Sequence, residues 1–118
     1  MSTTPEGKVK AEIKKYLREI GAYYFMPVQT GFGSTTLDFL VCYKGRFYGI
    51  EAKRKGVTKP RPLQGLVIDR IKEAGGIAFV ADDVETVKRH IPAVPVLSAG
   101  ITTIPPRGEI TGIKSQDI

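Results

Sequence analysis

The sequence is poor in the residues that build disulfides, zinc sites and histidine-based catalytic centres. The chain has 118 residues, with one cysteine, one histidine and no tryptophan. Because Cys42 is the single thiol, the chain can form neither an internal disulfide nor a zinc site made of several thiolates. Cys42 lies in an apolar run, and we predict that it is a core residue. Nothing near His90 resembles a Ser-His-Asp or Cys-His arrangement.

Long apolar stretches are also missing. None approaches the roughly 20 residues that span a bilayer, and the polar N-terminus lacks the apolar core of a signal peptide. We therefore expect a cytosolic protein without a membrane partner. The composition, 42% hydrophobic and 25% charged, is typical of a globular protein, and the length suits one domain. A net charge of +6 favours a polyanionic partner, above all nucleic acid, although basic charge also serves solubility.

The apolar pattern predicts an α/β domain in the order helix, three strands, helix, strand, with a last short helix. The first helix begins after the capping residue Thr4 and ends at Gly21, because apolar residues recur between them at helical spacing. We expect strands at 22–28, 37–43, 46–53 and 77–81, and further helices at 63–74 and 84–91. The aromatic residues of the strands are predicted to lie in the core: Tyr23, Tyr24, Phe25, Phe47 and Tyr48.

The sequence changes character at Pro92. Prolines interrupt any regular element beyond this point, and charges become sparse. Several aliphatic residues nevertheless make a purely solvated tail unexpected: Val94, Val96, Leu97, Ile101, Ile104, Ile110 and Ile113. We therefore divide the chain into a domain over residues 1–91 and an apolar, proline-containing tail over 92–118. The tail can pack on its own domain or take part in a dimer interface, and the sequence leaves both possibilities open.

Charged residues of the predicted hairpin gather at one of its ends. With a two-residue turn at Lys44-Gly45, antiparallel pairing places Asp38 directly opposite Glu51. Lys53 follows Glu51 by two positions, and strand side chains alternate between faces, so all three project from the same face. A turn shifted by one residue keeps this arrangement, whereas a three-residue loop would separate the three side chains.

Two opposed carboxylates repel each other and therefore need a cation. Mg²⁺ binds such carboxylates together with water and phosphate oxygens. Lys53 would then lie where it can orient a water molecule or stabilise charge on a phosphate. A salt-bridged surface hairpin, in which Lys53 pairs with an acid, explains the same spacing equally well.

The ordered set of these residues resembles the PD-(D/E)xK nuclease motif. Asp38 is followed, after twelve residues, by Glu51-Ala52-Lys53, and a glycine-bearing loop precedes the aspartate. Pro62-Leu63-Gln64 opens the next helix, which ends in Ala74-Gly75-Gly76 before an apolar strand. This pattern, over about residues 5–84, is similar to the VRR-NUC branch, in its small standalone virus-type form. The family usually has proline before the aspartate, where this chain has Leu37.

The resemblance implies a restriction-endonuclease-like core, with a mixed β-sheet flanked by helices, and a Mg²⁺- or Mn²⁺-dependent endonuclease. It implies that Asp38 and Glu51 bind the metal, that the Ala52 carbonyl is a further ligand, and that Lys53 is catalytic. The host implied is a bacterium or a phage-infected cell.

Two more residues match the family pattern, and each also fits an ordinary structural role. Gln64 would act beside the metal water or the DNA backbone, but it also suits the first turn of a helix. Glu6 would complete the metal site, but the helix dipole favours an acid at this position as well.

Basic residues surround the predicted site and would contact phosphates without reading bases. They are Lys14, Arg54, Lys55, Lys59 and Arg61. We therefore expect recognition of DNA structure. The resemblance to standalone members implies branched DNA, such as a four-way Holliday junction, and a homodimer that presents two sites. The alternatives are a nucleic-acid-binding module of the same fold that does not cut, and a structural dimerisation domain.

Overall fold

The computed structural model describes residues 4–28 and 36–94. They form helix α1 (Pro5–Glu19), strands β1 (Tyr23–Phe25), β2 (Phe39–Tyr43) and β3 (Arg46–Ala52), helix α2 (Pro62–Glu73), strand β4 (Ile77–Ala81) and helix α3 (Val84–His90). This is the predicted α/β order. Most of the glycine-bearing loop and the tail beyond residue 94 lie outside the described residues, so the packing of the tail stays a prediction.

The described strands form one mixed sheet in the order β1-β2-β3-β4. The first three strands are antiparallel, and β4 runs parallel to β3 because α2 crosses over between them. The predicted hairpin register is confirmed, with Tyr43 paired to Arg46. Lys44 and Gly45 both have positive φ, at 51° and 80°, which is the backbone of a two-residue turn whose twist matches that of the strands. This turn sets the register that brings Asp38 level with the end of β3.

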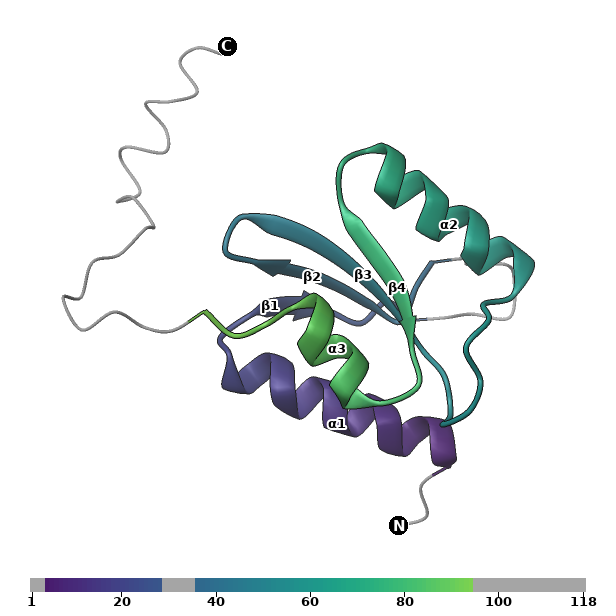
Figure 1. Cartoon of the computed structure of the whole chain (residues 1–118), viewed down its shortest axis with the longest axis horizontal. Helices are drawn as coiled ribbons and strands as arrows, with labels where there is room; N and C mark the ends of the chain where they lie inside the picture. The colour runs from purple at the N-terminus through teal and green to yellow at the C-terminus, as the bar shows by residue number, and fades with distance from the viewer. Residues whose placement is uncertain (1–3, 29–35, 95–118) are drawn as a thin grey trace, which may run out of the picture.

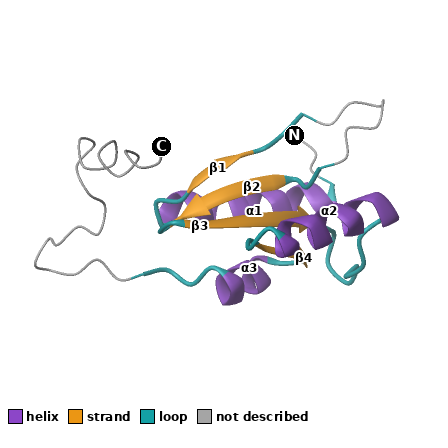
Figure 2. Ribbon diagram, turned by 90° about the horizontal axis from the view of Figure 1, so that it is seen from above, coloured by secondary structure: helices purple, strands orange, loops and turns teal. Residues whose placement is uncertain are grey.

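Helices cover both faces of the sheet (Figures 1 and 2). Helices α1 and α3 pack together on one face, and α2 lies on the other. The larger core lies on the α1 side and includes the fully buried side chains of Ile13, Leu17, Phe39 and Ile50. Alternation along the strands explains this core, because every second residue of β2 and β3 points toward α1.

Helix α2 approaches the sheet closely over β3 and β4. Its cluster contains Leu37, Ile68 and Ala78. A Cβ atom at Gly49 would lie 2.7 Å from Cδ1 of Ile71 and 2.8 Å from Cδ1 of Leu37. The absence of a side chain at Gly49 therefore lets α2 settle on β3, which places the start of α2 beside the end of that strand.

Helix α1 begins where the sequence predicts. The Thr4 side chain accepts a hydrogen bond of 2.9 Å from the Gly7 backbone N–H, and Pro5 occupies the first helical position. The first turn carries Glu6, near the positive end of the helix dipole. The buried stripe of α1 is Val9, Ile13, Tyr16 and Leu17, and packing of this stripe on the sheet directs the first turn toward the end of β3.

Part of the α2-side face of the sheet is uncovered, which corrects the predicted core. Tyr23, Phe25 and Phe47 are 70%, 55% and 45% exposed, and Cys42 is exposed as well. All four lie on the same face of the sheet as α2. This helix packs on β3 and β4, and it leaves the part of the face over β1 and β2 and the start of β3 uncovered. We call them the exposed apolar face. The strand aromatics that face α1 are half-buried or buried, as predicted: Tyr24 and Tyr48.

Some boundaries also differ from the prediction. β1 covers three residues of the predicted 22–28, and β2 starts at Phe39 because the chain bends at Asp38. β3 ends at Ala52, so Lys53 follows the strand. In the part of the chain that the structure describes, no helix combines the length and apolar character needed to cross a membrane.

Candidate active site

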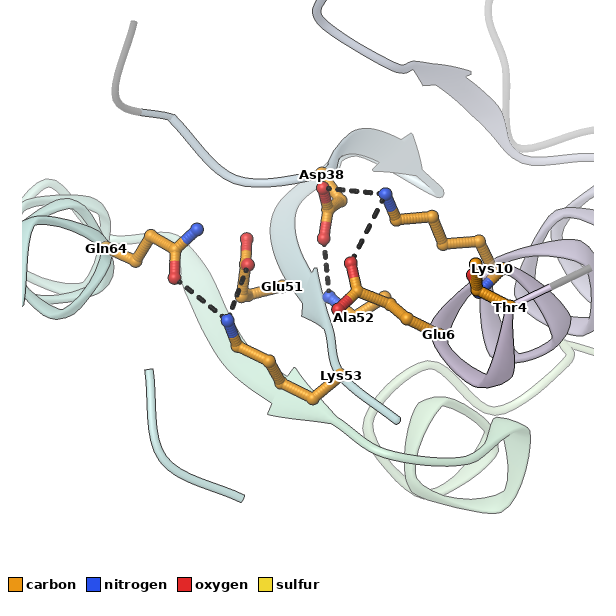
Figure 3. A network of polar contacts seen from close by, with 9 residues as sticks. Thr4, Glu6, Lys10, Asp38, Glu51, Ala52, Lys53 and Gln64 are labelled. Atoms are coloured by element: carbon orange, nitrogen blue, oxygen red, sulfur yellow. Dashed lines mark hydrogen bonds and ion pairs between the residues drawn. The ribbon is translucent and has the colours of Figure 1, made fainter. Parts of the chain in front are cut away.

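The charged residues of the motif meet at one end of the sheet. Asp38 lies just before β2, Glu51 lies near the carboxyl end of β3, and Lys53 follows that strand (Figure 3). The first turns of α1 and α2 approach this end of the sheet, bringing Glu6 and Gln64. Ligand sites in α/β proteins commonly lie beyond the carboxyl ends of parallel strands, and β3 and β4 end here.

A backbone hydrogen bond fastens Asp38 to β3. The strand ladder stops at the Phe39–Ile50 pair, one pair short of the predicted Asp38–Glu51 pair. Instead, Oδ2 of Asp38 accepts a hydrogen bond of 2.9 Å from the Ala52 backbone N–H. The carboxylate is thereby held level with the end of β3, so the predicted neighbourhood of the two acids is formed by a side chain rather than by strand pairing.

Glu51 and Lys53 form a buried ion pair. Their side chains are 3% and 9% exposed, and Nζ of Lys53 lies 3.3 Å from Oε2 of Glu51. Lys53 also donates a hydrogen bond of 3.2 Å to Oε1 of Gln64. The predicted alternative of a surface salt bridge is therefore wrong in one respect: the pair exists, but it is inside the protein. Burying two charges is costly, and such pairs are weak contributors to stability.

One oxygen of Glu51 is left without a partner. Burial, together with the nearby charge of Asp38, raises the pKa of Glu51 to about 7, although Lys53 opposes both effects. Oε1 of Glu51 is buried and has no hydrogen-bond partner among the described residues. A buried carboxylate oxygen without a partner costs free energy, which favours a site that takes up a cation.

The oxygen donors present fit a hard divalent ion. The predicted ligands, which are the carboxylates of Asp38 and Glu51 and the backbone carbonyl of Ala52, are of the type that Mg²⁺ prefers. Within the described ranges, no group of three or more histidine, cysteine, aspartate or glutamate side chains could hold a metal by itself. Water or phosphate oxygens would have to complete the coordination shell, as they commonly do for Mg²⁺.

Glu6 reaches the site through Lys10, a residue that the sequence reasoning missed. Nζ of Lys10 lies 3.4 Å from Oε2 of Glu6 and 3.5 Å from Oδ1 of Asp38. Burial opposes the charge of Lys10, but Asp38 and Glu6 outweigh this effect and raise its pKa. The spacing of four residues from Glu6 indicated a helical ion pair. Contact with Asp38 depends on how α1 crosses the sheet.

Gln64 combines the two roles that the sequence left open. Its Oε1 accepts hydrogen bonds of 3.2 Å from the Arg61 backbone N–H and 3.2 Å from Nζ of Lys53. The first bond satisfies a free amide at the start of α2. The second ties the amine of Lys53 to the same helix end.

The predicted phosphate-binding residues lie on α1 and on the segment between β3 and α2. Lys14 is half-buried on α1, four residues after Lys10, and Arg54, Lys59 and Arg61 are exposed.

The loop that follows Lys53 is attached to the turn before α3. Lys55 pairs with Asp83 at 2.6 Å, and the Gly56 backbone N–H donates to Oδ2 of Asp82 at 2.9 Å. Hydrogen bonds from Lys55 and Thr86 hold the pKa of Asp83 well below its usual range. Of the predicted phosphate contacts, Lys55 therefore has an acidic partner already.

Comparison with known proteins gives this site a context. No model of a protein family matches the sequence, and no curated protein is significantly similar to it. A solved structure described as a VRR_NUC domain is similar to this one, with a TM-score of 0.64 and 27% sequence identity, covering 75% of this chain and 96% of that chain. The chain is thus similar in both fold and sequence to a VRR-NUC domain. The predicted resemblance and the predicted fold class are thus confirmed, and the fold is that of a nuclease family.

We predict that Glu51→Gln stabilises the metal-free protein. The change removes a buried charge and keeps the side-chain volume. At pH 8 the gain should be on the order of 1–2 kcal/mol. It should shrink toward pH 5, because a folded-state pKa of about 7 means that wild-type Glu51 binds its proton there. Thermal unfolding in EDTA measures the effect. Glu85→Gln, at the exposed pair with Lys88, is the control and should change little, and a less stable Glu51→Gln protein would contradict the prediction.

Proposed function

We propose that this protein is a divalent-metal-dependent DNA endonuclease. Asp38, Glu51 and the Ala52 carbonyl would hold Mg²⁺ or Mn²⁺, and Lys53 would be the catalytic lysine. The observation that supports this most directly is the buried group of Asp38, Glu51 and Lys53, in which Oε1 of Glu51 has no partner in the described structure. A structural salt bridge would have no need of a second acid at this place.

The chain's own residues suggest how phosphodiester hydrolysis would proceed. A water oxygen adds to phosphorus, one P–O ester bond breaks, and the products are a terminal phosphate and a terminal hydroxyl. The bound ion would neutralise charge on the phosphate and lower the pKa of the attacking water. The Lys53 amine has three protons. Glu51 and Gln64 orient two of them, which leaves one for the attacking water or a phosphate oxygen.

The proposal predicts that cleavage needs both the ion and the three side chains. Asp38→Asn, Glu51→Gln and Lys53→Ala should each lower the cleavage rate by roughly 10²-fold or more, while Glu85→Gln should cut like wild type. The assay uses labelled linear, flapped and four-way DNA with Mg²⁺ or Mn²⁺, and EDTA should abolish cleavage. DNA affinity should fall little in the two acid variants, because phosphate repulsion is relieved.

Two results would contradict this proposal in different ways. Robust cleavage in excess chelator would remove the metal mechanism. Salt-sensitive DNA binding without cleavage, under every metal condition, would identify the chain as the non-cleaving module of the same fold.

We propose further that Lys14, Arg54, Lys55, Lys59 and Arg61 contact DNA phosphates. On duplex DNA each such contact contributes about −0.9 to the slope of log affinity against log salt. Replacing both Lys59 and Arg61, which are exposed, by alanine should flatten this slope by up to about 2. Lys55→Ala should have a smaller effect because Asp83 already pairs with this amine. Anisotropy titrations at several salt concentrations measure the slopes, and an unchanged slope in the double variant would place these charges away from DNA.

We also propose that the protein acts as a homodimer on branched DNA. A two-fold dimer presents two identical sites, which two symmetric cuts of a four-way junction require. The exposed apolar face is a surface that a second copy would bury. Its Phe47 also lines an open groove of about 660 Å³ beside the end of α2. The apolar tail beyond residue 94 would add to this interface.

Light scattering of the full chain at micromolar concentration tests the dimer. The wild type should have the mass of two chains, and Tyr23→Ser combined with Phe25→Ser should shift it toward one. Leu66→Ser, at a residue of α2 that is 58% exposed and outside the exposed apolar face, is the control. A monomeric wild type that cuts flaps and junctions equally would remove both the dimer and the junction selectivity.

A further inference from the structure

Lys10 supplies positive charge at an acid that we assign to the metal. The Lys10 side chain is 34% exposed and bridges Glu6 and Asp38. The Asp38 side chain is only 10% exposed. A carboxylate this buried needs a charge partner, and Lys10 is one that comes from a different element, α1. The pairing therefore belongs to the tertiary structure and is not a local helix contact.

Three of the four carboxylate oxygens of the two acids have a partner, and the fourth has none. Oδ2 of Asp38 accepts from the Ala52 backbone, and Oδ1 lies beside the Lys10 amine. Oε2 of Glu51 lies beside the Lys53 amine, and Oε1 is the oxygen without a partner. An entering cation would find an oxygen without a partner at Glu51, but at Asp38 it would meet an ammonium group. Two cations at one oxygen repel each other strongly when water is scarce.

We propose that Lys10 is a positioning residue that acts as a displaceable counter-ion of Asp38. It holds the carboxylate in place while the site lacks its ion, and it gives up Asp38 when the divalent ion enters. Glu6, one helical turn earlier on the same face of α1, retains the displaced amine. The inference rests on the proposed metal-dependent function and extends it, because it assigns to this chain a lysine that sets the affinity for the ion.

Competition of this kind has a signature that a merely structural role lacks. A group that stabilises the metal-free protein and must leave on binding lowers metal affinity by the same free energy. Removing it should therefore act in opposite directions on two measurements. The metal-free protein should become less stable, and the ion should bind more tightly.

The experiment uses the full chain without DNA. Mn²⁺ binding is measured by electron paramagnetic resonance titration, and thermal unfolding is measured in EDTA. Lys10→Met should bind Mn²⁺ about three- to tenfold more tightly than wild type and should melt a few degrees lower without metal. Lys8→Met, at an exposed lysine of the same helix, should change neither quantity, and Lys10→Arg should restore both toward wild type.

The outcomes separate this inference from the proposed function. Equal or weaker Mn²⁺ binding by Lys10→Met overturns the counter-ion role. The proposed metal site itself still stands in that case if Asp38→Asn abolishes Mn²⁺ binding. A wild-type chain that binds no Mn²⁺ at millimolar concentration overturns both. If Lys10→Met does not fold, Lys10→Gln provides the same comparison, because it removes the charge and keeps a hydrogen-bond donor toward Asp38.

Discussion

The hydrogen bond from the Ala52 backbone N–H to Oδ2 of Asp38 is the contact on which the candidate site depends. The β2–β3 ladder has already ended at this point, so without this bond the bend before β2 would leave Asp38 free to turn away from Glu51. The bond also anchors the residue whose carbonyl we assign to the metal. A single side-chain contact thus aligns the candidate oxygen donors. The register of the two strands that carry these donors is set by a tight turn.

The electrostatics of the candidate site are unfavourable for folding alone. Asp38, Glu51 and Lys53 are each at most 9% exposed, and one carboxylate oxygen has no partner. Burial, together with the charge of Asp38, raises the pKa of Glu51 to about 7. Natural proteins keep such costly arrangements mainly at functional sites, where stability is given up for binding or chemistry. The same buried charges explain why Lys10 of α1 pairs with Asp38 in addition to Glu6.

Much of this arrangement could be predicted from residue spacing, and the failures have a common cause. Lys44-Gly45 predicted the register, and alternation predicted a shared face for Glu51 and Lys53. Alternation does not reveal which part of a face a helix will cover, so Phe25 and Phe47 were wrongly placed in the core. Contacts between distant segments were equally out of reach. The partner of Asp38 on α1 depends on how that helix crosses the sheet, and neither periodicity nor local spacing encodes the crossing.

The turn before α3 has a consequence for how charge is presented to a polyanion. Asp82 holds the backbone of Gly56, and Asp83 both caps α3 and binds the amine of Lys55. Two acids that lie far away in the sequence therefore hold the start of the basic loop after β3. Phosphate approaching Lys55 meets an amine that already pairs with a carboxylate. The charge that the loop presents can thus be changed at these two acids, without any change to the groups that would face the scissile bond.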